Sequence, residues 1–429
     1  MISKRFLPLL LVIFLPVAVF GQDGAGSSDR ASPDSLNEHE ERIDKLEKTV
    51  RELEAKIEEA GRDDEMHRLK AKAQRLAGQK KEDDASLEER HFYSGIRQQS
   101  AMNPNISVGG DYYCAYGSSD SECNSERSEI NWGTGRFFLR EMELSFEAAL
   151  DPFARAKVFI GVGEDGADAC EAYMQSLNWP LNMNVKLGKY KMQFGSINRW
   201  HCHALPQFDR PLVMSNFFSN ETLKGLGVAA NFLLPSMTAH VNELDLEIAT
   251  AGADRSFTSE GRHNLVCVAH FKNYWDLDRS TFMELGLSGA TGHNDPDEEY
   301  RTYIGGADLR LKWSPPGRAK YRGFEWRTEA LYSSREAPEG AVDSWGMFSL
   351  VQFRLGARWF VGGRLDYSEM PYDSALHETG GAVNLDFWQS EFVVFRMQYT
   401  HIDRNFDEDD DRVIVQTVWA MGPHKHEAY

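Results

Sequence analysis

The sequence predicts an all-β fold, an antiparallel transmembrane β-barrel of about 16 strands preceded by an N-terminal coiled-coil helix. From residue 105 onward, segments of nine to fifteen residues alternate in polarity and are separated by turn signals. Tight connections such as Asp151-Pro152 alternate with long ones such as 117–135 and 195–223, which is typical of outer-membrane barrels. Aromatic residues such as Trp179, Trp359 and Trp419 stand near segment ends, as in interfacial girdles.

The N-terminus indicates export. Lys4 and Arg5 precede an apolar run over residues 6–20, and Gly21 offers a cleavage point, so residues 1–21 are predicted to be a signal peptide. A membrane anchor is the alternative, but the run is shorter than the ~20 residues that a spanning helix needs.

Residues 22–77 are predicted to form a periplasmic coiled-coil region. The apolar heptad positions are Leu36, Ile43, Val50 and Ile57 at a, with Leu46, Leu53 and Ala60 at d. β-branched residues at a with Leu at d favour two helices, and a trimer stays open. A charged linker, 78–104, separates this region from the barrel domain, 105–429.

The predicted strands cover most of the barrel domain. They are 106–116, 136–150, 154–163, 171–179, 183–194, 224–234, 237–250, 263–276, 280–291, 302–314, 321–335, 343–355, 356–368, 377–388, 390–403 and 412–421. No repeat of fixed length is present, which argues against a propeller.

Composition excludes several function classes. The formal net charge of −19 argues against nucleic-acid binding, which needs a basic surface. No serine nucleophile elbow or other catalytic signature is present, so an enzyme is not predicted.

The connection over residues 196–223 is far longer than a hairpin loop, and a loop of that length is usually functional. His201 and His203 project to one side of an extended backbone and could bind zinc or another divalent metal, with Asp209 or Glu221 as a further ligand. Alternatively, the two histidines hydrogen-bond to carboxylates of the barrel wall and fix the loop. A second such pair, His424 and His426, stands at the C-terminus.

The chain has five cysteines, an odd number for an exported protein. Cys114 and Cys123 are close in sequence, in what reads as one polar loop, and are predicted to form a local disulfide. Their spacing also suits a metal site, but no second Cys or His pair follows nearby.

Three motifs together resemble the phosphate-selective porin O and P family. They are GKYKMQFG (188–195), LPQFDRP (205–211) and GLGVAANF (225–232). The chain differs from the family pattern at Gln193, where a proline is usual, and in the sequence NRWHCH (198–203).

The resemblance implies a trimeric channel of sixteen strands, with its third outer loop folded inward as a constriction. It also implies that Lys189, Lys191 and Arg210 line the pore, and Arg199 in the same loop is a fourth candidate. Basic residues in such channels guide anions.

The predicted function is an outer-membrane porin, a passive channel for small hydrophilic solutes or ions, including anions such as phosphate, narrowed by the 196–223 loop. The expected partners are outer-membrane lipid, lipopolysaccharide, two further copies of the chain and the cell wall. One alternative is a metal-handling protein that uses the loop histidines. Another is a structural tether between membrane and cell wall.

Overall fold

The computed structural model describes residues 104–117, 122–124, 129–131, 137–164, 166–218, 222–253, 255–261 and 264–422. The chain divides into two units, 1–95 and 96–429, and all the described residues belong to the second. The predicted signal peptide, coiled coil and charged linker lie outside the described residues, apart from Pro104.

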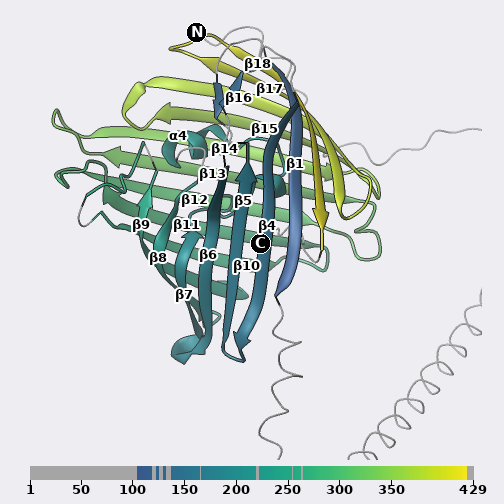
Figure 1. Ribbon diagram of the computed structural model, residues 1–429, viewed down its shortest axis with the longest axis horizontal. Helices are drawn as coiled ribbons and strands as arrows, with labels where there is room; N and C mark the ends of the chain where they lie inside the picture. Colours follow the sequence, from purple (N-terminus) through teal and green to yellow (C-terminus); the bar gives the residue numbers. More distant parts are fainter. Residues whose placement is uncertain are drawn as a thin grey trace, which may run out of the picture. The chain divides into compact units, whose positions relative to one another are not determined.

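Within the described part of the chain, sixteen strands close into one antiparallel barrel (Figure 1). They are β1 (Asn105–Gly117), β4 (Phe137–Asp151), β5 (Ala154–Gly163), β6 (Gly166–Trp179), β7 (Met183–Lys191), β8 (Lys224–Leu234), β9 (Val241–Gly252), β10 (Val266–Asp276), β11 (Thr281–His293), β12 (Arg301–Trp313), β13 (Gly323–Arg335), β14 (Val342–Arg354), β15 (Trp359–Met370), β16 (Asp373–Trp388), β17 (Val393–Arg404) and β18 (Asp410–Met421). Gly110 of β1 is opposite Met142 of β4 on one side and Trp419 of β18 on the other, which closes the ring.

Shorter elements lie in the connections. A hairpin of β2 (Glu122–Asn124) and β3 (Glu129–Asn131) stands between β1 and β4, and the 3-10 turn η3 (Pro180–Asn182) joins β6 to β7. The β7–β8 connection contains the 3-10 turn η4 (Cys202–Ala204) and the helix α4 (Leu212–Phe218). No helix in the described ranges is long and apolar enough to cross a membrane.

Each of the sixteen predicted strands corresponds to an observed strand, so the predicted fold class is confirmed. The largest difference is at β6, which begins at Gly166 rather than at residue 171, and β9 begins at Val241 rather than at 237. β7 ends at Lys191 rather than at residue 194, and β16 begins at Asp373 rather than at 377. β7 is shorter because the chain leaves the sheet after Lys191 and enters the lumen. β16 is longer because a register shift at Met370 lets Asp373 pair across the tight turn.

The strands alternate between a buried inward face and an exposed outward face. In β17, the inward Arg396, Gln398 and Thr400 are buried, whereas Phe395, Met397 and Tyr399 point outward and are 40–56% exposed. A polar interior with an apolar exterior is the pattern of a transmembrane barrel.

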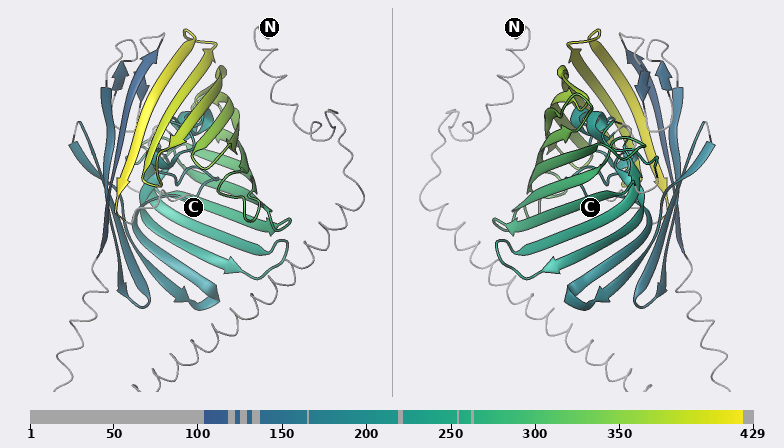
Figure 2. Two further views of the ribbon diagram at one scale, coloured as in Figure 1. Left: turned by 90° about the vertical axis from the view of Figure 1, so that its right-hand side faces the viewer. Right: turned by 90° about the vertical axis from the view of Figure 1, so that its left-hand side faces the viewer.

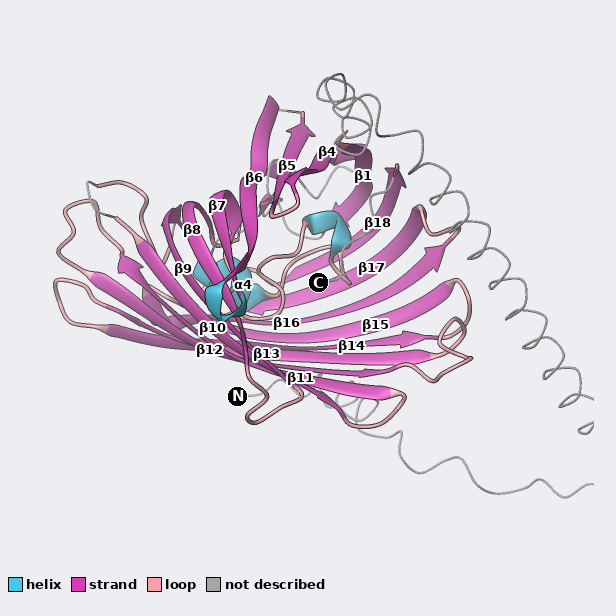
Figure 3. Ribbon diagram, turned by 90° about the horizontal axis from the view of Figure 1, so that it is seen from below, coloured by secondary structure: helices cyan, strands magenta, loops and turns pink. Residues whose placement is uncertain are grey.

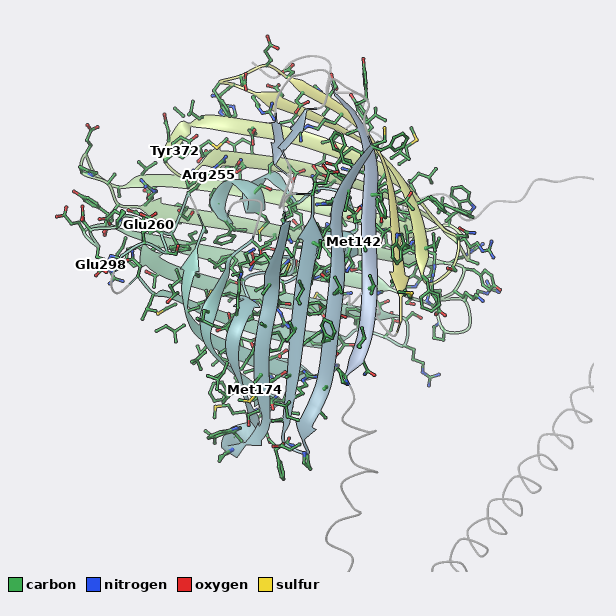
Figure 4. All side chains as sticks on the ribbon, in the orientation of Figure 1. Met142, Met174, Arg255, Glu260, Glu298 and Tyr372 are labelled. Atoms are coloured by element: carbon green, nitrogen blue, oxygen red, sulfur yellow. The ribbon has the colours of Figure 1, made fainter. Side chains whose placement is uncertain are left out.

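The connections fall at two ends of the ring. At the loop end they are 118–136, 164–165, 192–223, 253–265, 294–300, 336–341, 371–372 and 405–409, and at the turn end 152–153, 180–182, 235–240, 277–280, 314–322, 355–358 and 389–392. The predicted alternation of tight and long connections is therefore only partial, because 164–165 and 371–372 are tight turns at the loop end. Figure 4 shows Arg255, Glu260, Glu298 and Tyr372, all from loop-end connections, on the same side.

Outward aromatic pairs stand near both ends of the strands. Trp359 packs against Phe387 near the turn end, with ring centroids 4.8 Å apart, and Trp345 packs against Tyr367 towards the loop end at 4.6 Å. These positions are consistent with the interfacial girdles predicted from the sequence. The tilted strands that carry them are seen from two sides in Figure 2.

The helix α4 lies inside the ring of strands (Figure 3). It packs against β14 and β15, where glycines of the wall leave room for its side chains. A Cβ atom on Gly346 would lie 2.6 Å from Cγ2 of Val213 and 2.9 Å from the carbonyl oxygen of Tyr367. Gly380 provides similar room for Leu212.

We expect Gly346→Ala to lower the free energy of unfolding by about 1–3 kcal/mol, the usual cost of overpacking a buried contact. The measurement is a urea titration of the refolded protein in detergent, followed by tryptophan fluorescence. Gly305→Ala is the matched control, because a Cβ on this glycine of β12 meets nothing within 4 Å. Equal stabilities for the two variants would contradict the packing of α4 on β14.

Candidate functional site

Residues 192–223, hereafter the lumen loop, turn into the barrel instead of projecting from the loop end (Figure 3). The loop has an apolar surface on which Phe194, Val213 and Phe217 are completely buried. These side chains belong to one cluster with inward residues of β8–β14 such as Ala249 and Ile304. Removal of this apolar surface from water is the main force that holds the loop inside. The loop predicted at 196–223 therefore lies in the lumen.

Asn198 ties the two ends of the lumen loop together. Its side-chain amide donates to the carbonyl oxygens of Met192, at 2.8 Å, and Leu223, at 2.9 Å. Its oxygen accepts the backbone N–H of Leu223 at 2.9 Å. The loop is thus closed at its base independently of the barrel wall.

Carboxylates of the wall accept backbone N–H groups near and within the loop. The pairs are Lys191 with Glu171 (2.9 Å), Gln193 with Glu247 (2.9 Å), Ser196 with Glu329 (3.1 Å) and Leu212 with Asp366 (3.2 Å). Carboxyl oxygens can accept such hydrogen bonds. They satisfy N–H groups that no regular secondary structure satisfies.

Gly195 is required where the loop meets β13. Its φ of +58° lies in the left-handed region that favours glycine, and a Cβ atom there would lie within 1.7 Å of the Glu329 carboxylate. Its N–H donates to Oγ of Ser288 at 2.9 Å.

Arginines of the wall donate to carbonyl oxygens of the loop. The pairs are Arg140 with Phe208 (2.7 Å), Arg364 with Asp209 (2.8 Å) and Arg396 with Leu205 (3.0 Å). These arginines come from β4, β15 and β17, whereas Glu247 and Glu329 come from β9 and β13. The lumen loop is therefore anchored on opposite sides of the ring, and it crosses the lumen rather than following one wall.

His201 lies between two carboxylates of the wall. Its Nδ1 is 2.8 Å from Oε2 of Glu143, and its Nε2 is 3.0 Å from Oε2 of Glu171. Burial and the nearby Lys191 lower the pKa of His201, but the charges and hydrogen bonds of Glu143 and Glu171 outweigh them and raise it to about 9. His201 is therefore a cation at neutral pH and pins the loop to β4 and β6.

The three predicted metal ligands are not brought together. His203 lies near His201, with its Nδ1 3.8 Å from Glu143. Asp209 instead pairs with Arg364 at 3.2 Å and accepts a hydrogen bond from Gln398. Burial alone would raise the pKa of Asp209, but the charge of Arg364 and further polar neighbours together outweigh burial, and the pKa falls below its usual value.

Among the described residues, no group of three or more His, Cys, Asp or Glu side chains could hold a metal ion. The sequence also left open that the two histidines pair with carboxylates of the barrel wall, and His201 does so with Glu143 and Glu171. Glu221, His424 and His426 lie outside the described residues, and zinc binding by the loop stays a prediction.

The four predicted pore cations occupy different surroundings. Lys189 lies on the opposite face of β7 from the buried Tyr190 and pairs with Asp168 at 3.3 Å. Lys191 and Arg210 are buried, and both donate to the carbonyl oxygen of Trp200. Of the four, Arg199 lines a cavity in the lumen.

The predicted partners Cys114 and Cys123 do not share a loop. Cys114 lies in β1, opposite Val415 of β18, as a free thiol. Cys123 belongs to β2, and its side chain is outside the described residues. Cys114 therefore lies in a strand, as the strand predicted at 106–116 already implied, and not in the polar loop after residue 117.

Two cavities flank the lumen loop. One, of about 310 Å³, is lined by Arg155, Lys157, Lys186 and Arg199 with Glu147, Glu243, Asp245 and Glu247. The other, of about 270 Å³, lies between η4 and the inward faces of β12–β18. Both are lined by charged and aromatic side chains, which suits small polar solutes.

The sequence did not identify a row of inward arginines. They are Arg310, Arg327, Arg364, Arg396 and Arg412, all buried and all paired with inward carboxylates. Three of these pairs stand two residues apart on one strand, as in Glu325 and Arg327. Opposite charges at that spacing are the signal that could have found them, because residues i and i+2 share a face.

No protein-family model matches the chain. A curated protein of Aquifex aeolicus (strain VF5), described as uncharacterized, is 26% identical over 343 residues, covering 70% of this chain and 71% of the relative.

Several solved structures are similar. OprB of Pseudomonas putida has a TM-score of 0.52 at 8% identity, covering 77% of this chain and 97% of that chain. An anion-selective porin from Comamonas acidovorans has a TM-score of 0.52 at 9% identity, covering 74% and 99%. The outer membrane channel DcaP of Acinetobacter baumannii has a TM-score of 0.50 at 12% identity, covering 75% and 97%. The chain therefore has the barrel fold of these outer-membrane proteins.

His201 gives the fold a pH dependence. Its pKa of about 9 in the folded protein is above the ordinary value near 6.5, so its protonation stabilises the fold by roughly 3 kcal/mol. This contribution is complete below pH of about 6.5 and is lost as the pH rises through about 9. We expect the stability difference between the wild type and His201→Gln to shrink by that amount between pH 6 and pH 10, in urea titrations.

His240→Gln is the control, because His240 is an exposed residue of the 235–240 turn. Because its 4.0 Å contact with Asp276 is exposed to solvent, this substitution should change the stability much less than His201→Gln does at pH 6. A pH-independent difference for His201→Gln would show that the ring is not a buried cation.

Proposed function

We propose that the chain is a channel of the bacterial outer membrane through which small hydrophilic solutes or ions diffuse. The observation that carries the proposal is the lumen loop, which crosses a closed barrel with a charged inner wall and leaves cavities on either side. The apolar exterior supports a lipid environment. OprB, DcaP and the Comamonas porin, which share the fold, support a channel.

In this proposal, solutes pass beside the lumen loop, and the charges there select them. Arg199 and Lys186 line the cavity of about 310 Å³ on the β4–β9 side. On the β12–β18 side, the other cavity is lined by Lys312, Arg327, Arg354 and Arg396 against Glu325 and Asp386. The excess of basic groups on that side supports a preference for anions, which the Comamonas porin has by name.

Finer features extend the proposal. The three motifs at 188–195, 205–211 and 225–232 support membership of the phosphate-selective porin O and P family. Members of that family are trimers, so we also propose a homotrimer surrounded by lipid and lipopolysaccharide. The coiled coil at 22–77 would then stand in the periplasm.

The test of the channel is the single-channel conductance of refolded protein in a planar bilayer, with reversal potentials in a salt gradient. Steady conductance supports the proposal, and the sign of the potential gives the charge preference. The absence of conductance from protein shown to be folded and inserted would contradict it. Micromolar zinc added to the same recordings, with a His201→Ala and His203→Ala variant, tests the metal prediction.

Arg199→Glu should shift the reversal potential towards cations, because it reverses a charge in a cavity of restricted volume where screening by salt is weak. The control is Arg318→Glu, which makes the same change at an exposed residue of the 314–322 turn. We expect the shift for Arg199→Glu to be at least twice that of the control. Equal shifts would mean that Arg199 does not face the conducting path.

A further inference from the structure

The cavity of about 270 Å³ on the β12–β18 side is lined both by the lumen loop and by the barrel wall. Trp200 and the residues around η4 form its wall on the side of the lumen loop. Inward side chains near the turn end of the strands form the opposite wall. Its size is close to that of small-molecule sites in proteins, which begin near ~300 Å³.

Three basic groups of this cavity are in ion pairs. Lys312 is 3.4 Å and Arg327 2.5 Å from carboxylate oxygens of Glu325, and Arg396 is 3.0 Å from Asp386. These pairs weaken the attraction of the three groups for another anion but do not cancel it, because Lys312 and Arg327 share one carboxylate.

Arg354 differs from the other basic groups. Its Nη1 donates to the carbonyl oxygen of Ala319 at 2.8 Å, and it forms no ion pair with any residue that the structure describes. Its Nε is buried and has no hydrogen-bond partner in the described structure. A guanidinium with unused donors in a partly buried position suits a carboxylate, which it can bind with two parallel hydrogen bonds.

Aromatic rings stand beside Arg354. Its guanidinium carbon lies 4.7 Å from the centroid of the Phe360 ring, and the Phe360 and Trp388 rings are 6.0 Å apart. This cation–π contact with Phe360 helps to hold the guanidinium in place. Phe360 and Trp388 both line the cavity and offer a surface for a flat apolar group.

We propose that this cavity is a binding site for a small aromatic monocarboxylate, with the carboxylate on Arg354 and the ring against Phe360 and Trp388. The inference rests on the proposed channel function, in which the cavity is a station on the solute path. Inorganic phosphate fits less well, because it would gain nothing from the two rings. A second negative charge would be repelled by Glu325 and Asp386.

The test measures binding without conduction. 4-Fluorobenzoate is titrated into the detergent-solubilised full-length protein, and the broadening of its ¹⁹F resonance gives Kd. We expect Arg354→Gln to raise Kd about tenfold, because the Gln amide can keep only one of the two hydrogen bonds and carries no charge. Arg358→Gln, an exposed arginine of the 355–358 turn, is the matched control and should change Kd less than twofold.

A second variant tests the rings. Phe360→Leu keeps the charge of Arg354 and should raise Kd about fivefold, whereas excess inorganic phosphate should not displace the probe from the wild type. Displacement by phosphate at the same concentration as by benzoate, or equal Kd values for Arg354→Gln and Arg358→Gln, would overturn the proposal. If the protein conducts ions but does not bind the probe, the proposed binding site is wrong and the channel function stands. If the protein binds the probe but does not conduct, the binding site stands and the proposed channel function is wrong.

Discussion

A chain segment without regular secondary structure can lie inside a barrel only if its backbone polar groups find partners there. This constraint shapes the inner wall. Carboxylates on β6, β9, β13 and β15 accept N–H groups of or next to the lumen loop, and arginines on β4, β15 and β17 donate to its carbonyl oxygens. The inward charges are therefore structural as well as electrostatic, because the position of the loop depends on them.

The same constraint reduces the electrostatic field that the inward charges exert in the lumen. A count of inward arginines would indicate an anion channel, but Arg364 and Arg396 are each shared between a wall carboxylate and a loop carbonyl. Groups held in this way contribute little net field. The charges that can act on a solute are those less fully engaged, such as Arg354. For the same reason the net charge of −19 says little about selectivity.

The sequence predicted the strands well because their signal is local. Alternation along β17 or β11 needs only neighbouring residues, and turn residues mark the ends. The position of the 196–223 loop also followed, because its length and the motifs around it indicated an inward constriction. What the sequence could not supply were partners distant in the chain. Glu143 and Glu171 meet His201 only after β4 and β6 take their register, and no local pattern reveals that contact. Lys189 was predicted to line the pore, but it lies on the other face of β7, because Tyr190 packs inward with the apolar side chains of the lumen loop.

The crossing loop also explains why stability and selectivity are linked in this fold. His201 on one side and Asp209 on the other fix the loop by ion pairs with the wall, and Phe194 and Phe217 fix its middle by burial. A change at any of these residues moves the loop, and the loop forms a boundary of both cavities. A substitution that leaves the anchors intact, such as one at Arg354, therefore changes the electrostatic field in the channel without moving the loop. Substitutions at the anchors change both the field and the position of the loop, because the loop that narrows the lumen is held by the charged side chains that line the lumen.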